Sequence, residues 1–563
     1  VQRLGGDPAL ALELAEDLLE LVLQTVEHED LSWCAATTTG PCAAAFSGTG
    51  MVTRGPRGHL PASIYSPAME RRAKIMATLG PASRDEAVLR ELVRAGVDLF
   101  RLNLSHGTQE QHRETLHRVR RIAGEEGCHL PVALDLMGPR YRLGRIPDEP
   151  RTLAPDEEVV LGPEAGDVDL PVDPEILEHL EPAERVLIDG GLIELRVQSK
   201  QGDRVRARVV NGGPVKTRKG INLPDSNLPF EISEKDRSDI AFAVAEGADY
   251  LAASYVGAAA HVEAVRSAAA EAGGRIPVIA KIERATAVEC LTGITEAADG
   301  LMVARGDLGV EVPLYTVPVL QKRIVAAGRL AGKPVIVATQ MLESMVEQPR
   351  PTRAEATDVA NAVFDGADAL MLSGETAAGR YPVQTVETMA RIIQEAEEYA
   401  RTSDDRHTLQ PLGQVHARRT YALESEPQID SESALQVPDM VSSAAVYAAE
   451  QLGVRRIVAF SQSGFTARLV ARYRPRSPIM AFTPDGRVAR QLQLVWGVRP
   501  FVAEFQVGSL DDIVQVVERQ LLAARLVEPG DRIIILMGHP VRERPLTNLM
   551  RVHRVRSSEE RKP

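Results

Sequence analysis

The chain has 563 residues, of which 44% are hydrophobic and 25% charged, and its formal net charge is −13. This length favours three or four domains of about 150 residues, and the acidic balance argues against a nucleic-acid or anionic-membrane surface. The four cysteines have no CxxC spacing, and no stretch is apolar enough to span a membrane, so we expect a cytoplasmic protein without a disulfide framework.

Residues 1–70 stand apart from the rest. They begin with leucines at helical spacing opposite an acidic face, namely Leu10, Leu14, Leu18 and Leu21. This pattern predicts a short amphipathic helix, and the small polar residues after it predict a flexible linker. No basic region precedes a clean apolar stretch, so a signal peptide is not expected. Two interpretations stay open: a dispensable or overextended start, since Met51 and Met69 could each begin the chain, or a docking or regulatory helix.

Two segments, 71–139 and 219–400, alternate short apolar runs with helical patterns. Their eight candidate strands are KIMATLG, DLFRLNLS, PVALDLMG, YLAASYV, VIAKIE, GLMVARGD, PVIVATQ and ALMLSGE. Repeated βα units predict a parallel sheet, and eight of them predict an α/β fold of the (β/α)8 barrel type. In such barrels the chemistry lies at the carboxyl ends of the strands, where these runs end in polar residues.

The remaining segments interrupt or follow this barrel. Residues 140–218 alternate with a period of two and contain several Gly and Asp turns, which predicts a small β domain inserted into a barrel loop. Residues 401–436 are polar and are expected to form a surface linker. Residues 437–563 again alternate strands with helices, which predicts a C-terminal α/β domain.

Four blocks in order carry the strongest functional signal: LMVARGDLG at 301–309, PVIVATQMLES at 334–344, QPRPTRAEATDVANAV at 348–363 and LMLSGETA at 370–377. Each alone could be a barrel strand with its loop. Together they resemble the pyruvate kinase family, and the resemblance runs from about Lys74 to the C-terminus. It implies transfer of the phosphoryl group of phosphoenolpyruvate to ADP, which gives pyruvate and ATP in glycolysis. It also implies an allosteric homotetramer that uses Mg²⁺ or Mn²⁺. In this family the insertion, here residues 140–218, would be a small β-barrel lid, and the C-terminal domain, here residues 437–563, would be regulatory.

The carboxylates Glu283 and Asp307 are candidate metal ligands, because Mg²⁺ prefers a few carboxylates completed by substrate oxygens and water. Lys281 lies two residues before Glu283, so both side chains of a strand would share one face. By resemblance, Lys281 and Arg101 would contact the transferring phosphoryl group. Gly306, Asp307 and Thr339 would form the site of the substrate carboxylate. Thr339 would also act in enolate protonation through a water relay that includes Ser373.

Further roles follow from the resemblance alone. In potassium-dependent members, K⁺ lies at the positions of Asn103, Ser105 and Asp135 with one backbone carbonyl, here assigned to Leu136. Asn103 and Ser105 are expected to alternate with Arg101 on one strand face. The ADP phosphates would be approached by residues of the barrel and of the lid junction, namely Asn103, His106, Arg142 and Lys219.

The chain departs from the family at residues 135–142, where it reads DLMGPRYR against the common D-T-K-G-P-E-I-R. Arg140 replaces a glutamate beside the expected K⁺ site, and its fixed charge could take the place of K⁺. We therefore expect weak or absent activation by K⁺, unless Arg140 points to solvent. In the insertion, Gly190 stands where the family usually has a second aspartate, whereas Asp189 is present. The sequence therefore does not predict which contacts close the lid.

The segment SQSGFT resembles the loop that binds the effector phosphate in the family, with Ser461, Ser463, Gly464 and Thr466 as its candidate residues. An ordinary helix N-cap is the simpler explanation of such a loop alone. Arg542 and Arg544 could add anion contacts. The alternatives to an active, sugar-phosphate-regulated pyruvate kinase are a catalytically degenerate paralogue with a binding role and another metal-dependent enolate barrel, such as an aldolase.

Overall fold

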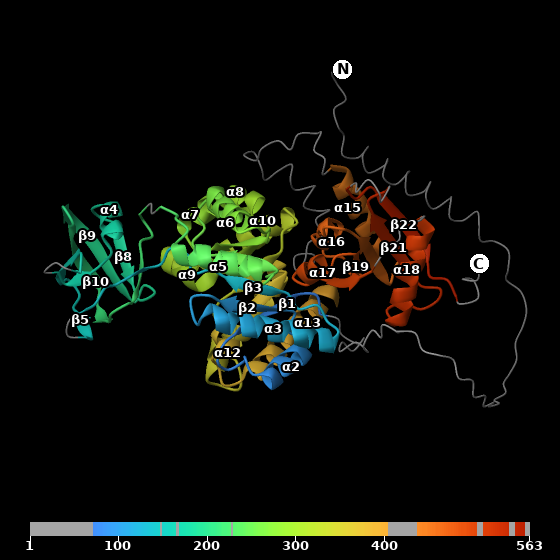
Figure 1. Cartoon of the computed structure of the whole chain (residues 1–563), viewed down its shortest axis with the longest axis horizontal. Helices are drawn as coiled ribbons and strands as arrows, with labels where there is room; N and C mark the ends of the chain where they lie inside the picture. The colour runs from blue at the N-terminus through green and yellow to red at the C-terminus, as the bar shows by residue number, and fades with distance from the viewer. Residues whose placement is uncertain are drawn as a thin grey trace, which may run out of the picture. The chain divides into compact units, whose positions relative to one another are not determined.

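The computed structural model describes residues 71–146, 149–164, 168–226, 229–402, 436–503, 510–539 and 546–557 (Figure 1). The expected amphipathic helix in residues 1–70 and most of the expected linker, at 403–435, lie outside these described residues. Within the described ranges, no helix combines the length and the apolar character that crossing a membrane would require.

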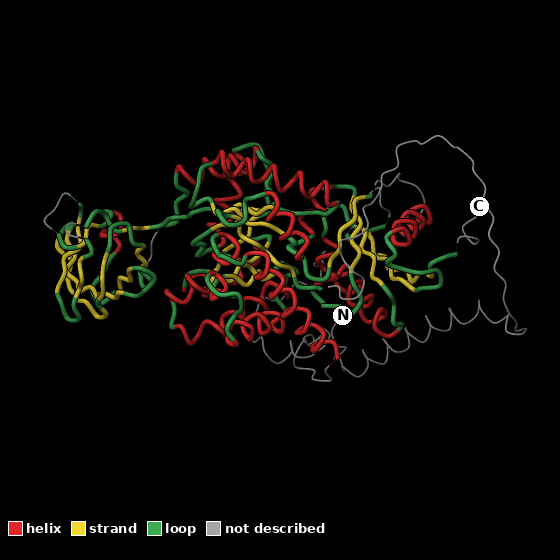
Figure 2. Tube along the Cα trace, turned by 90° about the horizontal axis from the view of Figure 1, so that it is seen from below, coloured by secondary structure: helices red, strands yellow, loops and turns green. Residues whose placement is uncertain are grey.

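Eight parallel strands close into a barrel in the order β1-β17-β16-β15-β14-β13-β3-β2, and helices surround them (Figure 2). The strands are β1 (Lys74–Leu79), β2 (Leu99–Asn103), β3 (Val132–Asp135), β13 (Tyr250–Ala253), β14 (Val278–Ile282), β15 (Gly300–Ala304), β16 (Val335–Ala338) and β17 (Ala369–Leu372). All eight expected strands are present and the barrel is confirmed. Their residues are almost all buried, as apolar strands covered on both faces must be.

The helices between the strands begin and end at sequence signals. Thr108 and Thr352 form capping boxes at the starts of two of them, and Gly366 closes one in the left-handed conformation with φ 90°. The helices are α2 (Glu86–Ala95), α3 (Gln109–Glu126), α5 (Glu234–Ala245), α6 (Ala259–Glu271), α7 (Ala285–Glu289), α8 (Leu291–Ala297), α9 (Arg305–Glu311), α10 (Val317–Leu330), α11 (Arg353–Asp365), α12 (Gly374–Ala377) and α13 (Pro382–Thr402), with the 3₁₀ turns η1 (Leu314–Thr316) and η2 (Glu343–Val346).

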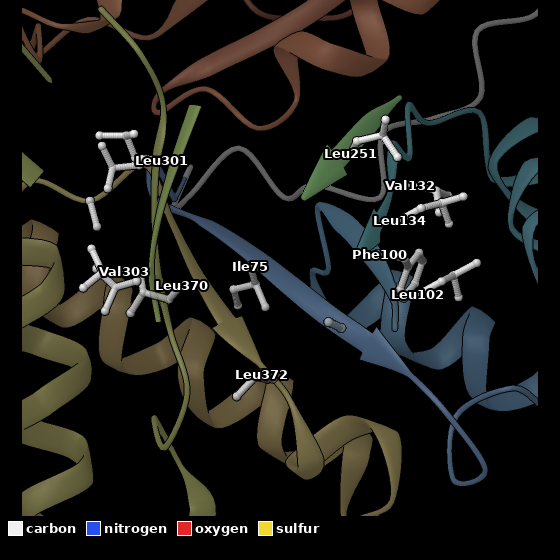
Figure 3. Close-up of a cluster of buried hydrophobic side chains, with 14 of the residues drawn as sticks. Ile75, Phe100, Leu102, Val132, Leu134, Leu251, Leu301, Val303, Leu370 and Leu372 are labelled. Atoms are coloured by element: carbon white, nitrogen blue, oxygen red, sulfur yellow. The ribbon is translucent and has the colours of Figure 1, made fainter. Parts of the chain in front are cut away.

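Alternation along the strands divides the barrel core in two. Residues such as Ile75, Phe100 and Leu372 pack between the strands and the helices (Figure 3). Their neighbours point inward and fill the barrel, among them Met76, Leu99 and Met302. Leu494 of the C-terminal domain belongs to the same inner cluster, so the barrel interior is a packed core to which the second domain contributes.

The insertion has its own core and is built from short strands. Its main sheet has the order β4-β12-β8-β9-β10-β6-β7, and β11 pairs with β5. The bounds are β4 (Tyr141–Arg142), β5 (Arg151–Leu153), β6 (Glu158–Gly162), β7 (Leu170–Pro171), α4 (Pro174–His179), β8 (Arg185–Ile188), β9 (Ile193–Gln201), β10 (Arg204–Asn211), β11 (Gly213–Val215) and β12 (Gly220–Asn222). A small β-barrel was expected here, and the described strands of its main sheet have an open order. β12 begins just after residue 218 and pairs with β4 and β8 of the same sheet.

The C-terminal domain is a five-stranded sheet between two layers of helices. The sheet order is β20-β19-β18-β21-β22, with only β22 antiparallel among its described pairs. α15, α16 and α17 pack on one face and α18 on the other. The bounds are α15 (Gln436–Gln451), β18 (Arg456–Phe460), α16 (Phe465–Ala471), β19 (Ile479–Thr483), α17 (Gly486–Leu492), β20 (Val498–Val502), α18 (Leu510–Ala523), β21 (Arg532–Met537) and β22 (Leu549–Arg554).

Asp368 joins this domain to the barrel. It directly precedes β17, and its carboxylate accepts hydrogen bonds from the guanidinium of Arg474, at 3.0 and 3.2 Å, and from the backbone N–H of Trp496, at 3.0 Å. It also accepts from the N–H of Val335 in the neighbouring strand. The side chains of Asp368 and Arg474 are 4% and 5% exposed, so the contact is a buried ion pair at the amino ends of the strands.

Candidate active site

At the opposite, carboxyl ends of the strands, side chains of alternating charge meet. The ammonium of Lys281, on β14, lies 2.8 Å from Oε1 of Glu283 and 3.3 Å from Oδ1 of Asp135. Nε of Arg101, on β2, donates to Oδ2 of Asp135 at 2.6 Å. All four side chains are at most 11% exposed. Four charges of the expected site therefore form one continuous buried network.

The electrostatics of this network favour the charged, protonated form of Lys281. Burial alone would lower the pKa of Lys281, but the carboxylates of Asp135 and Glu283 raise it above its usual value. Burial raises the pKa of Asp135, and Arg101 and Lys281 outweigh it and lower that pKa. A permanent positive charge in a water-poor pocket is what stabilises a transferring phosphoryl group.

Glu283 and Asp307 suit a divalent cation. Glu283 directly follows β14, and Asp307 lies in the first turn of α9. Burial and then the neighbouring Asp307 keep the pKa of Glu283 raised despite Lys281, so a further cation between these carboxylates is electrostatically favoured. The described residues contain no group of three or more His, Cys, Asp or Glu able to hold a metal. Such a sparse oxygen donor set fits Mg²⁺, which keeps substrate oxygens and water as its other ligands.

Two of the residues predicted to hold the substrate carboxylate lie together. The backbone N–H of Gly306, at the start of α9, donates to the hydroxyl of Thr339 at 2.7 Å, and that hydroxyl donates to the carbonyl of Ala338. Thr339 and Gln340 have φ values of 68° and 52°. Such backbone strain in non-glycine residues is concentrated at functional sites. The N–H of Gly306 and the hydroxyl of Thr339 are thus in direct contact between α9 and the end of β16.

The oxygens expected to bind K⁺ make contacts within the protein. The carbonyl of Leu136 accepts the hydroxyl of Ser254 at 2.8 Å, and Oδ1 of Asn103 accepts the N–H of Ser105 at 3.1 Å. β2 ends at Asn103. The expectation that Ser105 shares a strand face with Arg101 is therefore wrong, because the chain has already turned at Ser105.

Arg140 does not contact these oxygens. Its Nε donates to the phenol oxygen of Tyr255 at 3.3 Å, and its guanidinium carbon lies 6.0 Å from the centre of that ring. Burial alone would lower the pKa of Arg140, but Tyr255, Asp307 and Glu283 raise it overall. The guanidinium therefore lies within the electrostatic field of the two candidate metal ligands.

The candidate nucleotide residues fall into two places. Arg142 pairs with Gly220 between β4 and β12, and its Nη1 donates to the carbonyl of Arg218 at 2.9 Å. Lys219 lies beside them, with its ammonium 2.7 Å from Oδ2 of Asp189. His106, by contrast, follows β2 on the barrel, where its carbonyl contacts the ring of His112. The fold thus gathers Arg142 and Lys219 at the base of the insertion and leaves His106 on the barrel.

The two remaining predicted groups have buried partners. The backbone N–H of Ser373 donates to Oε2 of Glu375 at 2.7 Å. In the C-terminal loop, Gly464 has φ 78° at the start of α16, and the hydroxyl of Thr466 pairs with that of Thr547 at 2.8 Å in a buried contact. The hydroxyl of Thr466 therefore already has a protein partner. Arg542 and Arg544 lie outside the described residues.

Three site residues were not singled out from the sequence. The hydroxyl of Ser254 accepts a hydrogen bond from the ammonium of Lys281 at 2.7 Å. The N–H of Tyr255 donates to Glu283. The hydroxyl of Thr78 accepts a hydrogen bond from Nη1 of Arg101 at 3.1 Å. All three lie at strand carboxyl ends, in the runs AASYV and MATLG. Polarity at that end of an apolar run was the available signal, and it was not applied to these three residues.

The fold and this charge network define a barrel enzyme of phosphoryl or enolate chemistry. Comparison with known proteins narrows the class. Residues 70–386 match the family model described as "Pyruvate kinase, barrel domain", and residues 439–553 match "Pyruvate kinase, alpha/beta domain". The chain therefore belongs to the pyruvate kinase family.

Comparison with individual proteins supports the same family. A pyruvate kinase of Mycobacterium tuberculosis H37Rv is 42% identical over 492 residues, which cover 86% of this chain and 99% of the relative. One of Geobacillus stearothermophilus is 40% identical over 86% of this chain and 80% of the relative. The crystal structure of a pyruvate kinase from Cryptosporidium parvum superposes with a TM-score of 0.77 at 33% identity, over 86% of this chain and 96% of the other.

The enzyme assignment follows from this membership. The chain is a phosphotransferase whose reaction is transfer of the phosphoryl group of phosphoenolpyruvate to ADP. Neither the aldolase-type interpretation nor the degenerate paralogue gains support from the matched families, and the charged network expected of an active member is assembled.

Proposed function

We propose that the network centred on Lys281 performs the phosphoryl transfer, with a divalent cation held by Glu283 and Asp307. The observation that carries this proposal is the position of the Lys281 ammonium between two buried carboxylates, 2.8 Å from Glu283 and 3.3 Å from Asp135. The carboxylates keep the lysine charged, and phosphoryl transfer depends chiefly on fixed positive charge and positioning.

Each group has a defined task. Lys281 and Arg101 neutralise the phosphoryl oxygens, while the N–H of Gly306 and the hydroxyl of Thr339 hold the substrate carboxylate. When bound, the cation supplies Lewis-acid charge to the phosphoryl and carboxylate oxygens. The hydroxyl of Thr339 is too weak an acid to protonate the enolate alone. A relay of water molecules that includes Ser373 therefore delivers the proton. Arg142 and Lys219, with Asn103 and His106 on the barrel, approach the ADP phosphates as the lid closes.

K⁺ is not required in this proposal, because Arg140 supplies a fixed charge in its place. Two observations support it. The oxygens of Leu136 and Asn103 already accept hydrogen bonds within the protein. Arg140 lies against Tyr255 and within the field of Glu283 and Asp307.

Regulation and assembly complete the proposal. A sugar phosphate would bind at Ser461, Ser463 and Gly464, where the loop turns into α16, and Thr466 would first leave Thr547. The active form would be a cytoplasmic homotetramer. Exposed apolar residues support self-association: Leu314 and Tyr315 on η1 are 73% and 82% exposed, and the edge strand β22 exposes Met550 and Val552.

The test is pyruvate formation from phosphoenolpyruvate and ADP with Mg²⁺, in sodium-free buffer with tetramethylammonium as the only other cation, before and after K⁺ is added. Strong turnover that K⁺ does not change supports both the chemistry and the role of Arg140. Turnover that appears only with K⁺ keeps the enzyme and removes Arg140 from that role. Folded protein inactive in both buffers, even with sugar phosphates present, would refute the catalytic proposal.

A further inference from the structure

Tyr255 has a backbone conformation that its residue type disfavours. It follows β13 by two residues, and its φ is 59°. The left-handed region is uncommon for non-glycine residues and strained for a bulky one. Such a conformation persists only where the surrounding contacts over-determine it. Two contacts hold Tyr255, one through its backbone and one through its side chain.

The first contact is through the backbone. The N–H of Tyr255 donates to Oε2 of Glu283 at 2.7 Å, while Oε1 of the same carboxylate lies 2.8 Å from the ammonium of Lys281. Both oxygens of this candidate metal ligand are therefore oriented. The turn at Tyr255 supplies one of the two restraints, and it does so without any requirement on the side chain.

The second contact is through the side chain. The phenol oxygen of Tyr255 accepts Nε–H of Arg140 at 3.3 Å, and the ring lies 6.0 Å from the guanidinium carbon. Within the described residues, this is the one side-chain hydrogen bond of Arg140. Since Arg140 is otherwise exposed, its long side chain would sample many rotamers without this contact.

The chemistry of the acceptor matters. A carboxylate in this position would hold the guanidinium but cancel its charge toward Glu283 and Asp307. A phenol is neutral at neutral pH, so it fixes the guanidinium and leaves its charge available. A phenylalanine would keep the ring and the turn but would offer no acceptor.

We propose that Tyr255 is a positioning residue that fixes the Arg140 guanidinium through its phenol oxygen, and that it thereby sets the independence of the enzyme from monovalent cations. The inference rests on the proposed role of Arg140. It assigns to one residue two separable functions: the backbone orients a candidate metal ligand, and the phenol oxygen orients the charge that replaces K⁺.

The test compares Tyr255→Phe with the wild type in tetramethylammonium buffer and in K⁺ buffer. Loss of a hydrogen bond to a charged group corresponds to about a 10- to 100-fold effect, so we expect kcat/KM in tetramethylammonium to fall by about that factor. Added K⁺ should restore most of the loss. The Mg²⁺ concentration for half-maximal rate and the Tm should stay unchanged, because the backbone N–H remains.

Tyr141→Phe is the matched control. Its hydroxyl donates to Glu175 at 3.3 Å, and it lies next to Arg140 in the chain without touching the candidate metal ligands. It should behave as wild type in both buffers. A Tyr255→Phe enzyme that is unaffected without K⁺, or whose loss K⁺ does not relieve, would overturn the inference.

A double-mutant cycle with Arg140→Ala provides the second measurement and does not depend on K⁺ rescue. If Tyr255 acts through Arg140, Tyr255→Phe should have no further effect on kcat/KM in the Arg140→Ala background. Additive effects would overturn the inference. The two proposals fail separately: a wild type that requires K⁺ removes the role of Arg140, whereas a K⁺-independent wild type with an unaffected Tyr255→Phe variant removes only the role of Tyr255.

Discussion

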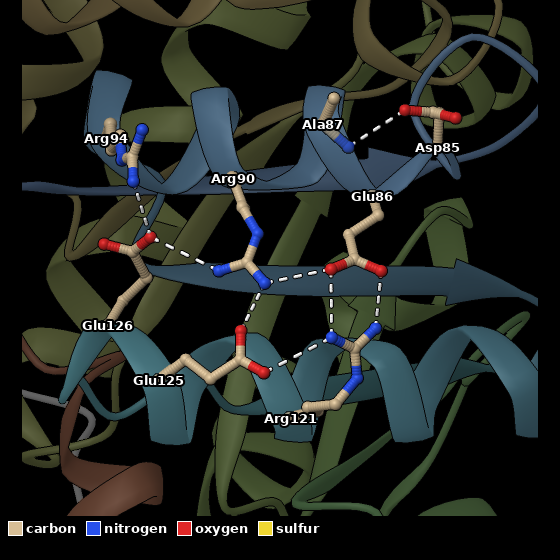
Figure 4. Close-up of polar contacts among 8 residues, drawn as sticks. All are labelled: Asp85, Glu86, Ala87, Arg90, Arg94, Arg121, Glu125 and Glu126. Atoms are coloured by element: carbon tan, nitrogen blue, oxygen red, sulfur yellow. Dashed lines mark hydrogen bonds and ion pairs between the residues drawn. The ribbon is translucent and has the colours of Figure 1, made fainter.

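Two clusters of alternating charge in this molecule share a pattern and differ in burial. On the outer helices α2 and α3, Arg90 and Arg121 each contact both Glu86 and Glu125 (Figure 4). At the carboxyl ends of the barrel strands, Arg101, Asp135, Lys281 and Glu283 form the second cluster. Side chains of the helix cluster are 26–49% exposed, whereas those of the barrel cluster are 1–11% exposed.

The difference shows that charge pairing alone does not mark a functional site. Water screens the helix cluster, where such pairs contribute little to stability. Hydrogen bonds from Arg121 and Arg90 lower the pKa of Glu86 to about 2, yet this carboxylate remains solvated. In the barrel the same pairing acts at low dielectric, where each charge strongly influences its neighbours.

The largest effect should follow from Lys281→Met. It removes the central cation and leaves Asp135 and Glu283 facing each other, so we expect kcat to fall by at least about 100-fold, the usual cost of losing one transition-state donor. Steady-state kinetics with circular dichroism would check activity and folding together. Lys322→Met is the control, because Lys322 pairs with Asp365 at the surface and is 58% exposed. A Lys281→Met enzyme within tenfold of wild type would contradict the assignment.

An intermediate effect should follow from Asp368→Asn, in the buried pair that joins the two domains. Removing one partner of such a pair costs about 3–5 kcal/mol, so the free energy of unfolding should fall by that order, as measured by denaturant titration. Asp156→Asn is the control: its pair with Arg208 is exposed, and asparagine tolerates its φ of 67°. Equal losses in the two variants would mean that burial does not decide the outcome.

The smallest effect should follow from Glu86→Gln in the helix cluster. The carboxylate contacts two arginines, but all three side chains are partly exposed. We expect no resolved change in Tm at 0.15 M salt and an unchanged kcat. Differential scanning calorimetry at low and high salt would test this. A decrease comparable to that of Asp368→Asn would show that the two clusters are energetically alike.

The sequence predicted the barrel because each strand is a short apolar run that ends in polar residues, and this pattern is local. It also predicted that Lys281 and Glu283 share one face, since they are two residues apart on a strand. Arg101 and Asp135 lie in different runs, and the barrel geometry unites them.

Other features depend on contacts between distant segments. Arg140 and Tyr255 are 115 residues apart, and Thr466 and Thr547 are 81 apart. No spacing rule connects such pairs. The left-handed backbone of Tyr255 and Thr339 was equally hidden, because neither is a glycine or an asparagine. β12 lies just after the expected end of the insertion at residue 218, and only its pairing with β4 and β8 relates it to the insertion.

The strand β17 is only four residues long, with Asp368 before it and Ser373 after it. At about 3.3 Å per residue, these two positions are separated by roughly 17 Å of fully extended chain. Asp368 binds Arg474 of the C-terminal domain, and Ser373 lies at the carboxyl end of the strand, where its N–H donates to Glu375. An extended strand cannot lengthen further, so a displacement of one end along the strand is transmitted to the other end. Any displacement of the far domain that moves Asp368 along the strand must therefore also displace Ser373, or break the pairing of β17 with its neighbours.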